Sequence, residues 1–269
     1  MKKTKYLIVG GCSFTAYKGC WPNWLKKYLK NYRLQNTAVG CSDNTLIARK
    51  IIYNVNSMLE NNYNPENIIV GIMWSGYDRK SFYSDNKFQL EKMFGMDAKG
   101  LKTMSRARRK VNDSPVNPHF EPHDRKGVYL LSNANMITDY PYAKNYYKQY
   151  HNKTYNRIET YEQILRVQWF LKSHNIKYFM VPYTDDWLLH SKHSQLDYLT
   201  KMIDTDYWLP VSSEKGWLDK NSKFSNTDYD PIRKITREPD DHHPSSYQHK
   251  EFVDQVVVPW LNSKEWITK

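Results

Sequence analysis

Cysteine is scarce in this sequence, whose 269 residues contain only Cys12, Cys20 and Cys41. An odd count without a CxxC pair does not form a disulfide framework, and reduced thiols are typical of proteins that fold in the cytoplasm. Long hydrophobic runs are also missing, because no stretch approaches the roughly 20 apolar residues of a membrane-spanning helix. The apolar run after the basic start is too short for the core of a signal peptide. We therefore expect cytoplasmic folding, no signal peptide and no membrane contact.

Acidic residues are the minority among the charges, since 28 Asp and Glu face 40 Lys and Arg, giving a net charge of +12. This excess favours acidic partners, such as anionic polysaccharide or nucleic acid. The tightest basic run, residues 106–110, is interpreted as a solvated loop or helix face rather than a nucleic-acid patch. Aromatic residues make up 15% of the chain, and those of residues 79–157 could stack on sugar rings or on bases. No pattern indicates an oligomeric state.

Apolar runs and helical spacing alternate along the chain, which predicts an α/β fold with a central parallel sheet covered by helices on both faces. Residues 79–157 lose this periodicity and are interpreted as a long insertion after the third strand, within a single domain of residues 1–269. Strands are predicted at residues 6–9, 34–39, 68–74 and 177–183, and helices at residues 21–29, 45–59, 158–173 and 245–261.

Ser13 follows the first apolar run and two glycines, Gly10 and Gly11. In a parallel sheet this is the carboxyl end of a strand, where reacting groups gather. One interpretation makes Ser13 a helix cap, and the other makes it a nucleophile. Cys12 is a competing nucleophile, although strand alternation favours a small buried residue on the other side of the strand.

A second polar cluster, residues 240–244, precedes the predicted last helix and reads Asp-Asp-His-His-Pro. A serine needs a base to remove its proton, and the base needs an acid to hold its tautomer. Asp240 and His243 are three residues apart, so one turn can bring them together, and Pro244 would set the start of the helix. Asp241 competes with Asp240 for the acid role.

Several other polar residues are candidates for the acid role or for metal binding. Glu238 is a more distant candidate for the acid, His242 is expected at the rim, and His249 is expected to pack on or cap the last helix. The same Asp/His cluster could instead bind a metal. His190 and His193 lack an evident third ligand, so no metal site is expected there.

These elements resemble the SGNH (GDSL-like) hydrolase superfamily in order and spacing. Its first block appears as Gly11-Cys12-Ser13-Phe14, its second as Gly40, and its fifth as residues 240–244. Its third block, usually Gly-x-Asn-Asp, reads Ser75-Gly76-Tyr77-Asp78, so the family's asparagine is missing. The resemblance implies an SGNH/flavodoxin-like α/β/α sandwich with no cofactor.

The resemblance also implies a role for individual residues. Ser13 would be the nucleophile, His243 the general base and Asp240 the acid that orients it. The amides of Ser13 and Gly40 would hold the oxyanion, and the side chain of Asn44 is a candidate third donor. Trp74 and Tyr77, at the end of the third strand, are candidates for substrate binding.

Three functions follow from these patterns. The first is a serine esterase that removes an acyl group, such as acetyl, from a carbohydrate or another small polar ester. The second is a catalytically weak or inactive SGNH-like module for binding or assembly, for example in a viral particle. The third is a metal-dependent phosphoesterase or nuclease built on the Asp/His cluster.

Overall fold

A computed structural model gives the structure of this chain. It describes residues 4–84, 128–133, 141–183, 196–210, 229–230, 235–236 and 243–267. The Asp240 and Asp241 predictions, the pair His190 and His193, and the basic run at residues 106–110 lie outside the described residues.

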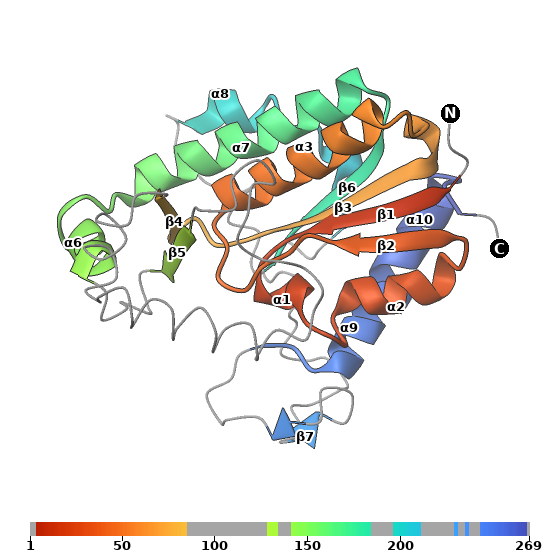
Figure 1. The fold of residues 1–269 in the computed structure, drawn as a ribbon, viewed down its shortest axis with the longest axis horizontal. Coiled ribbons are helices and arrows are strands. Elements are labelled where there is room, and N and C mark those ends of the chain that lie inside the picture. The colour runs from red at the N-terminus through yellow and green to blue at the C-terminus, as the bar shows by residue number, and fades with distance from the viewer. Residues whose placement is uncertain are drawn as a thin grey trace.

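A central sheet of four parallel strands in the order β2-β1-β3-β6 organises the described chain (Figure 1). The prediction of an α/β fold with a parallel sheet is confirmed at this level. The two inner strands, β1 after its first residues and β3 throughout, are apolar and buried, as strands covered on both faces require. The strands are β1 (Lys5–Gly10), β2 (Tyr32–Asn36), β3 (Ile68–Trp74) and β6 (Lys177–Pro182).

Helices cover both faces of this sheet, as Figure 1 shows. The long helices α3 (Asn44–Glu60) and α7 (Lys153–Ser173) pack on one face. On the other face lie α2 (Trp21–Tyr28) and the carboxyl-terminal helices α9 (Ser246–Phe252) and α10 (Val258–Ser263). Strand alternation explains the two cores, because Ile8 packs with the first group and Leu7 and Val9 with the second. Each such fully buried aliphatic side chain contributes about 1.5–3 kcal/mol.

Smaller elements complete the described chain. Strands β4 (Arg79–Ser84) and β5 (Val128–Asn133) form an antiparallel pair beyond the carboxyl end of β3, next to α6 (Pro141–Gln149). The others are α1 (Ser13–Ala16), α8 (Asp197–Thr200), β7 (Tyr229–Asp230), β8 (Ile235–Thr236) and the 3-10 turns Pro65–Asn67 and Thr205–Tyr207. Helix α7 begins at Lys153, inside the predicted insertion of residues 79–157.

The second strand ends earlier than the sequence predicts, at Asn36 rather than at residue 39. The side chain of Asn36 accepts a hydrogen bond from the Ala38 amide at 3.0 Å, which turns the backbone away from the sheet. Thr37 still donates its amide to Val9 O at 2.8 Å, so the departing loop stays attached to β1.

The last helix is interrupted, whereas the sequence predicts one helix over residues 245–261. A π-helical turn, Val253–Val257, separates α9 from α10. Pro259 follows in the first turn of α10 and has no N–H to donate to the preceding turn. A π turn absorbs such a break without ending the helix.

Candidate active site

Ser13 is the first residue of α1, directly after the turn that ends β1, and its side chain is buried. The turn is held by Cys12 O, which accepts the amides of Thr15 and Ala16 at 2.9 and 3.0 Å. Gly11 is required for this turn. A Cβ placed there would lie 2.3 Å from Thr15 Oγ1 and 3.1 Å from Met73 O. The absence of a side chain at residue 11 therefore lets α1 fold back against the sheet and fixes Ser13 at its carboxyl edge.

His243 lies just before α9, in a segment held by a capping box. Ser245 Oγ accepts the Gln248 amide at 3.3 Å, and Gln248 Oε1 accepts the Ser245 amide at 2.8 Å. Pro244 therefore precedes the helix cap, whereas the sequence predicts that it starts the helix. The box fixes the direction of the chain two residues after His243.

The structure brings Ser13 and His243 together across 230 residues of sequence. His243 Nε2 lies 2.7 Å from Ser13 Oγ, which is the distance that proton transfer between a serine and a histidine requires. The Phe14 ring packs on the imidazole at 4.9 Å between centroids, and the edge of Tyr183 packs on Phe14 at 5.0 Å. The packing of these two aromatic rings thus restricts the position of the imidazole.

No protein-family model matches this chain, and no curated protein matches it significantly in sequence. What it does must therefore be inferred from its own residues and their geometry.

The loop that carries Gly40 runs beside the Ser13 turn. Asn36 Nδ2 donates to Thr15 O at 2.8 Å, and the Val39 amide donates to Gly11 O at 3.2 Å. A Cβ on Gly40 would lie 2.7 Å from Tyr17 Oη, so the loop and the chain after α1 are closely packed there. The residue after Gly40, Cys41, has a φ of 63°, which marks a sharp turn into the cap of α3.

Asn44 occupies a different place from the one predicted. Its side-chain nitrogen donates to Ser75 O at 2.9 Å and to Thr160 Oγ1 at 3.1 Å, and its oxygen accepts the Ser75 amide at 2.7 Å. A side-chain amide has only two N–H donors. Because both hydrogens are engaged, Asn44 has none left for an oxyanion in this arrangement. Its role is to tie the end of β3 to α3 and α7.

The two residues predicted to bind substrate differ in position. Trp74 is fully buried in the core beside α3 and α7, so the prediction that it contacts substrate is wrong for this structure. The β-strand alternation that sets its direction could have indicated this. Tyr77 is partly exposed after β3, and the guanidinium of Arg157 lies 4.8 Å from its ring. Its part in substrate binding stays a prediction.

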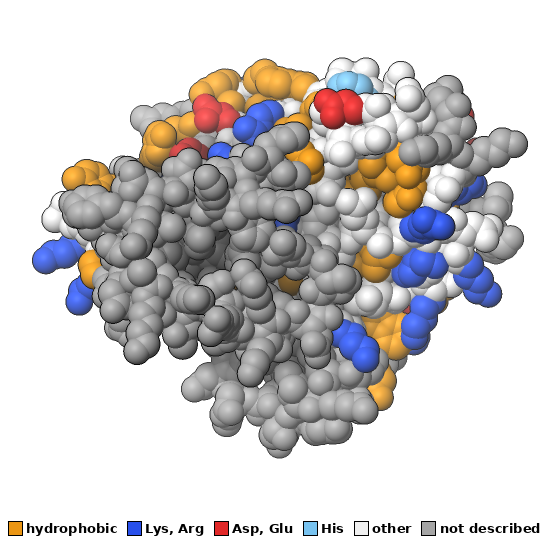
Figure 2. All heavy atoms as spheres, in the orientation of Figure 1, with side chains coloured by type: hydrophobic (Ala, Val, Ile, Leu, Met, Phe, Trp, Pro, Cys, Tyr) orange, Lys and Arg blue, Asp and Glu red, His pale blue; other side chains and the backbone are white. Residues whose placement is uncertain are grey.

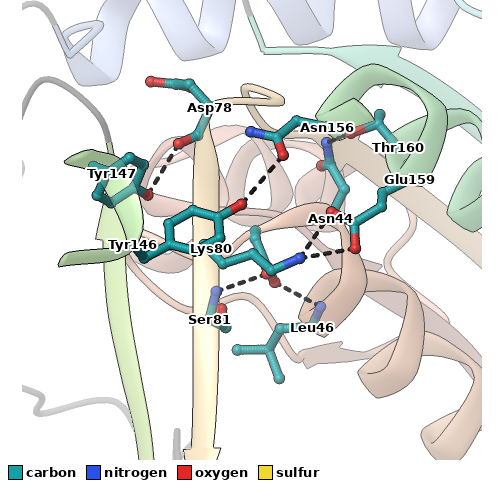
Figure 3. A network of polar contacts seen from close by, with 11 residues as sticks. Asn44, Leu46, Asp78, Lys80, Ser81, Tyr146, Tyr147, Asn156, Glu159 and Thr160 are labelled. Carbon is teal, nitrogen blue, oxygen red and sulfur yellow. Dashed lines mark hydrogen bonds and ion pairs between the residues drawn. The ribbon is translucent and has the colours of Figure 1, made fainter. Parts of the chain in front are cut away.

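A network of polar contacts holds β4 to α3 and α7 (Figure 3). Asp43 Oδ1 accepts the Leu46 amide at 2.8 Å, which caps α3, and Asp43 Oδ2 accepts the Ser81 amide at 2.7 Å. Burial raises the pKa of Asp43, although these two amides oppose the shift. Lys80 Nζ lies 2.8 Å from both carboxylate oxygens of Glu159. The network positions the segment that directly follows the third block.

The aromatic residues of α6 extend this network. Tyr146 donates to Asn156 Oδ1 at 3.2 Å, and Tyr147 donates to Asp78 O at 3.0 Å (Figure 3). A small polar pocket opens beside these contacts. It is lined by Asp43, Asn44, Thr45, Tyr77, Arg79, Lys80, Asn156, Glu159 and Thr160.

Among the described residues, no three His, Cys, Asp or Glu side chains are grouped so that they could hold a metal ion. No described helix is both long and apolar enough to cross a membrane.

Proposed function

We propose that this chain is a serine ester hydrolase of SGNH type. The observation that carries the proposal is the 2.7 Å distance between His243 Nε2 and Ser13 Oγ. Serine and histidine in hydrogen-bond contact form the minimal unit of nucleophilic acyl transfer. Their place supports the proposal, because Ser13 follows the central strand β1 at the edge where open parallel sheets hold their ligands.

The fold supports the same assignment. The four described strands of the sheet are β1, β2, β3 and β6 in chain order. When they are numbered 1 to 4 in that order, their arrangement across the sheet is 2-1-3-4. This order is that of flavodoxin-like sheets, the architecture that the resemblance to SGNH hydrolases implies. The segments that resemble the family's first three blocks follow β1, β2 and β3 and therefore share one edge of the sheet.

The reaction would proceed in two acyl transfers. His243 Nε2 accepts the proton of Ser13 Oγ while the oxygen attacks the ester carbonyl, forming a tetrahedral oxyanion. The oxyanion collapses, the bond to the alcohol breaks, and His243 returns the proton to the departing alcohol. Water then attacks the acyl-serine by the same route, releasing the acid and restoring Ser13. Asp240, with Asp241 as the competitor, would hold the tautomer of His243.

We propose a small acyl group on a carbohydrate as the substrate. The net charge of +12 suits an acidic glycan. In Figure 2, basic side chains gather over the region of α2, while the acidic side chains in view lie over α3 and α7. An acidic polymer would be drawn toward the basic side of this face.

The altered third block favours one competing function, a catalytically weak SGNH-like binding module. The family's asparagine is missing there, and Asn44 is committed to Ser75 and Thr160. Loss of one oxyanion donor costs about 10²–10³ in kcat. A binding module would keep the Ser13–His243 contact but not turn over an ester.

Hydrolysis of p-nitrophenyl acetate separates these functions. Wild type is expected to hydrolyse the ester, and Ser13→Ala and His243→Gln to lower kcat by about 10³-fold or more. The control is His174→Gln, because His174 contacts Phe170 at the end of α7 and should leave kcat unchanged. Equal hydrolysis by wild type and Ser13→Ala would contradict the proposal. If a chelator abolishes the activity of wild type while Ser13→Ala remains active, a metal-dependent phosphoesterase would instead be favoured.

A further inference from the structure

Arg79 carries a buried cationic atom for which the described part of the chain offers no hydrogen-bond partner. It is the first residue of β4, directly after the third block, and its Nη1 is buried without a hydrogen bond to any described residue. A buried polar group that lacks a hydrogen bond is costly, and a charged one more so. Such an atom points to a ligand or a transition state that completes its hydrogen bonding.

Two aromatic rings, those of Tyr183 and Phe14, lie between the guanidinium and His243. Arg79 Cζ is 5.2 Å from the ring centroid of Tyr183. The edge of Tyr183 packs on Phe14, which follows Ser13 and packs on His243. A single pair of aromatic rings therefore connects the cation to the catalytic histidine.

The electrostatic surroundings of Arg79 point to the same edge of the sheet. Burial lowers the pKa of Arg79, but the thiol of Cys12 and other neighbouring groups, including Cys41, outweigh this effect and raise it. The guanidinium is therefore charged at neutral pH, as arginine ordinarily is. Cys12 directly precedes Ser13, and Cys41 directly follows Gly40, so Arg79 is a neighbour of both loops that would supply oxyanion amides.

Other donors near this edge are already engaged. Both amide hydrogens of Asn44 are used, and Lys80 is paired with Glu159. Arg79 differs from both because its Nη1 has no such partner among the described residues.

We propose that Arg79 replaces the missing third-block asparagine and donates an Nη1–H to the oxyanion of the tetrahedral intermediate. This inference rests on the proposed esterase function. A guanidinium donates charge-assisted hydrogen bonds, which are stronger than those of an amide, to an oxygen that becomes negative. The donor would thus follow β3 two residues later than the asparagine of the family pattern, at the start of β4 instead of within the block.

The test uses full-length protein and a neutral ester, p-nitrophenyl acetate, so that recognition of a charged substrate plays no part. Arg79→Met is expected to lower kcat by about 10²–10³-fold with KM nearly unchanged, because the donor acts in the transition state. Arg79→Lys keeps the charge but loses the planar arrangement of guanidinium donors. Its kcat should therefore fall between those of wild type and Arg79→Met. Guanidinium ion, added at non-denaturing concentration to Arg79→Ala, is expected to restore part of kcat.

Controls separate this inference from the proposed function and from misfolding. Arg166→Met removes one positive charge from the exposed side of α7 and should keep wild-type kcat. Thermal unfolding of each variant checks that it is folded, and rescue by guanidinium requires an intact site. If wild type and Ser13→Ala are equally active, the esterase proposal itself fails.

Two results would overturn the role of Arg79 while leaving the esterase intact. In the first, Ser13→Ala is inactive but Arg79→Met and Arg79→Lys keep wild-type kcat. In the second, Arg79→Met raises KM for a negatively charged acetate ester, such as an acetylated uronic acid, and leaves kcat for the neutral ester unchanged. The second result would make Arg79 an anchor for the substrate instead of an oxyanion donor.

Discussion

Replacing Gly11 by alanine tests whether the turn before Ser13 is fixed by close packing. The added Cβ would lie 2.3 Å from Thr15 Oγ1 and 2.8 Å from Thr15 Cβ. Thr15 cannot rotate away without cost, because its Oγ1 accepts a hydrogen bond from the buried Trp21 Nε1 at 3.0 Å. Relief therefore requires a shift of α1 together with loss of that hydrogen bond.

The expected cost follows from these two terms. Overpacking a tight site costs about 1–3 kcal/mol, and losing a buried hydrogen bond adds about 1 kcal/mol. Gly11→Ala should therefore lower the free energy of unfolding by about 2–4 kcal/mol, or Tm by about 4–16 °C for a chain of this size. Displacement of Ser13 by about 1 Å should lower kcat by about 10²-fold.

Gly10→Ala is the matched control, measured by the same thermal melts and the same ester assay. Its Cβ would meet Ile51 Cγ1 and Cδ1 at 2.8 and 2.9 Å, which are contacts with a side chain alone, whereas a Cβ on Gly11 also approaches a backbone oxygen. It should lose less stability than Gly11→Ala and keep most of its kcat. The steric argument is wrong if Gly11→Ala melts within about 2 °C of wild type with unchanged kcat, since a shift that small corresponds to under about 1 kcal/mol.

Two further predictions concern residues of α3. Asn44→Ala should lower the free energy of unfolding by about 2–4 kcal/mol in chemical denaturation, because it removes three buried hydrogen bonds. Unchanged stability together with a large loss of kcat would instead identify Asn44 as the oxyanion donor. Burial lowers the pKa of Lys50 to about 8, from 10.5 in the unfolded chain, so the contribution of this group to stability rises as the pH increases from 8 to 10.5. Lys50→Met should therefore be more stable than wild type at pH 7, with an advantage that shrinks toward pH 10; a difference that stays constant with pH would contradict the depressed pKa.

The sheet was predictable because short runs of apolar residues in the sequence mark its strands. β3 is apolar throughout, and β1 and β6 are apolar after an initial lysine, as strands covered on both faces require. The end of β2 was not predictable in this way. The chain leaves the sheet after Asn36, whose side chain accepts a hydrogen bond from the Ala38 amide, and apolar periodicity does not indicate that contact.

The candidate site was predictable where its residues stand in short motifs. Ser13 after two glycines and His243 before a proline mark positions on a strand end and before a helix, and the structure places the two side chains in contact. Asn44 and Arg79 could not be placed from sequence. The partner of Asn44 is Thr160, 116 residues away, and the neighbours of Arg79 come from three separate loops. Such assignments depend on tertiary packing, which a local pattern does not contain.

A fluorophosphonate probe measures directly whether Ser13 is a nucleophile activated by His243. Full-length protein is incubated with the probe and digested, and the modified peptide is identified by mass spectrometry. A single adduct is expected on Ser13, forming slowly or not at all in His243→Gln and at the normal rate in His174→Gln. No adduct on Ser13 across a broad pH range, or one on Cys12 in its place, would contradict this expectation.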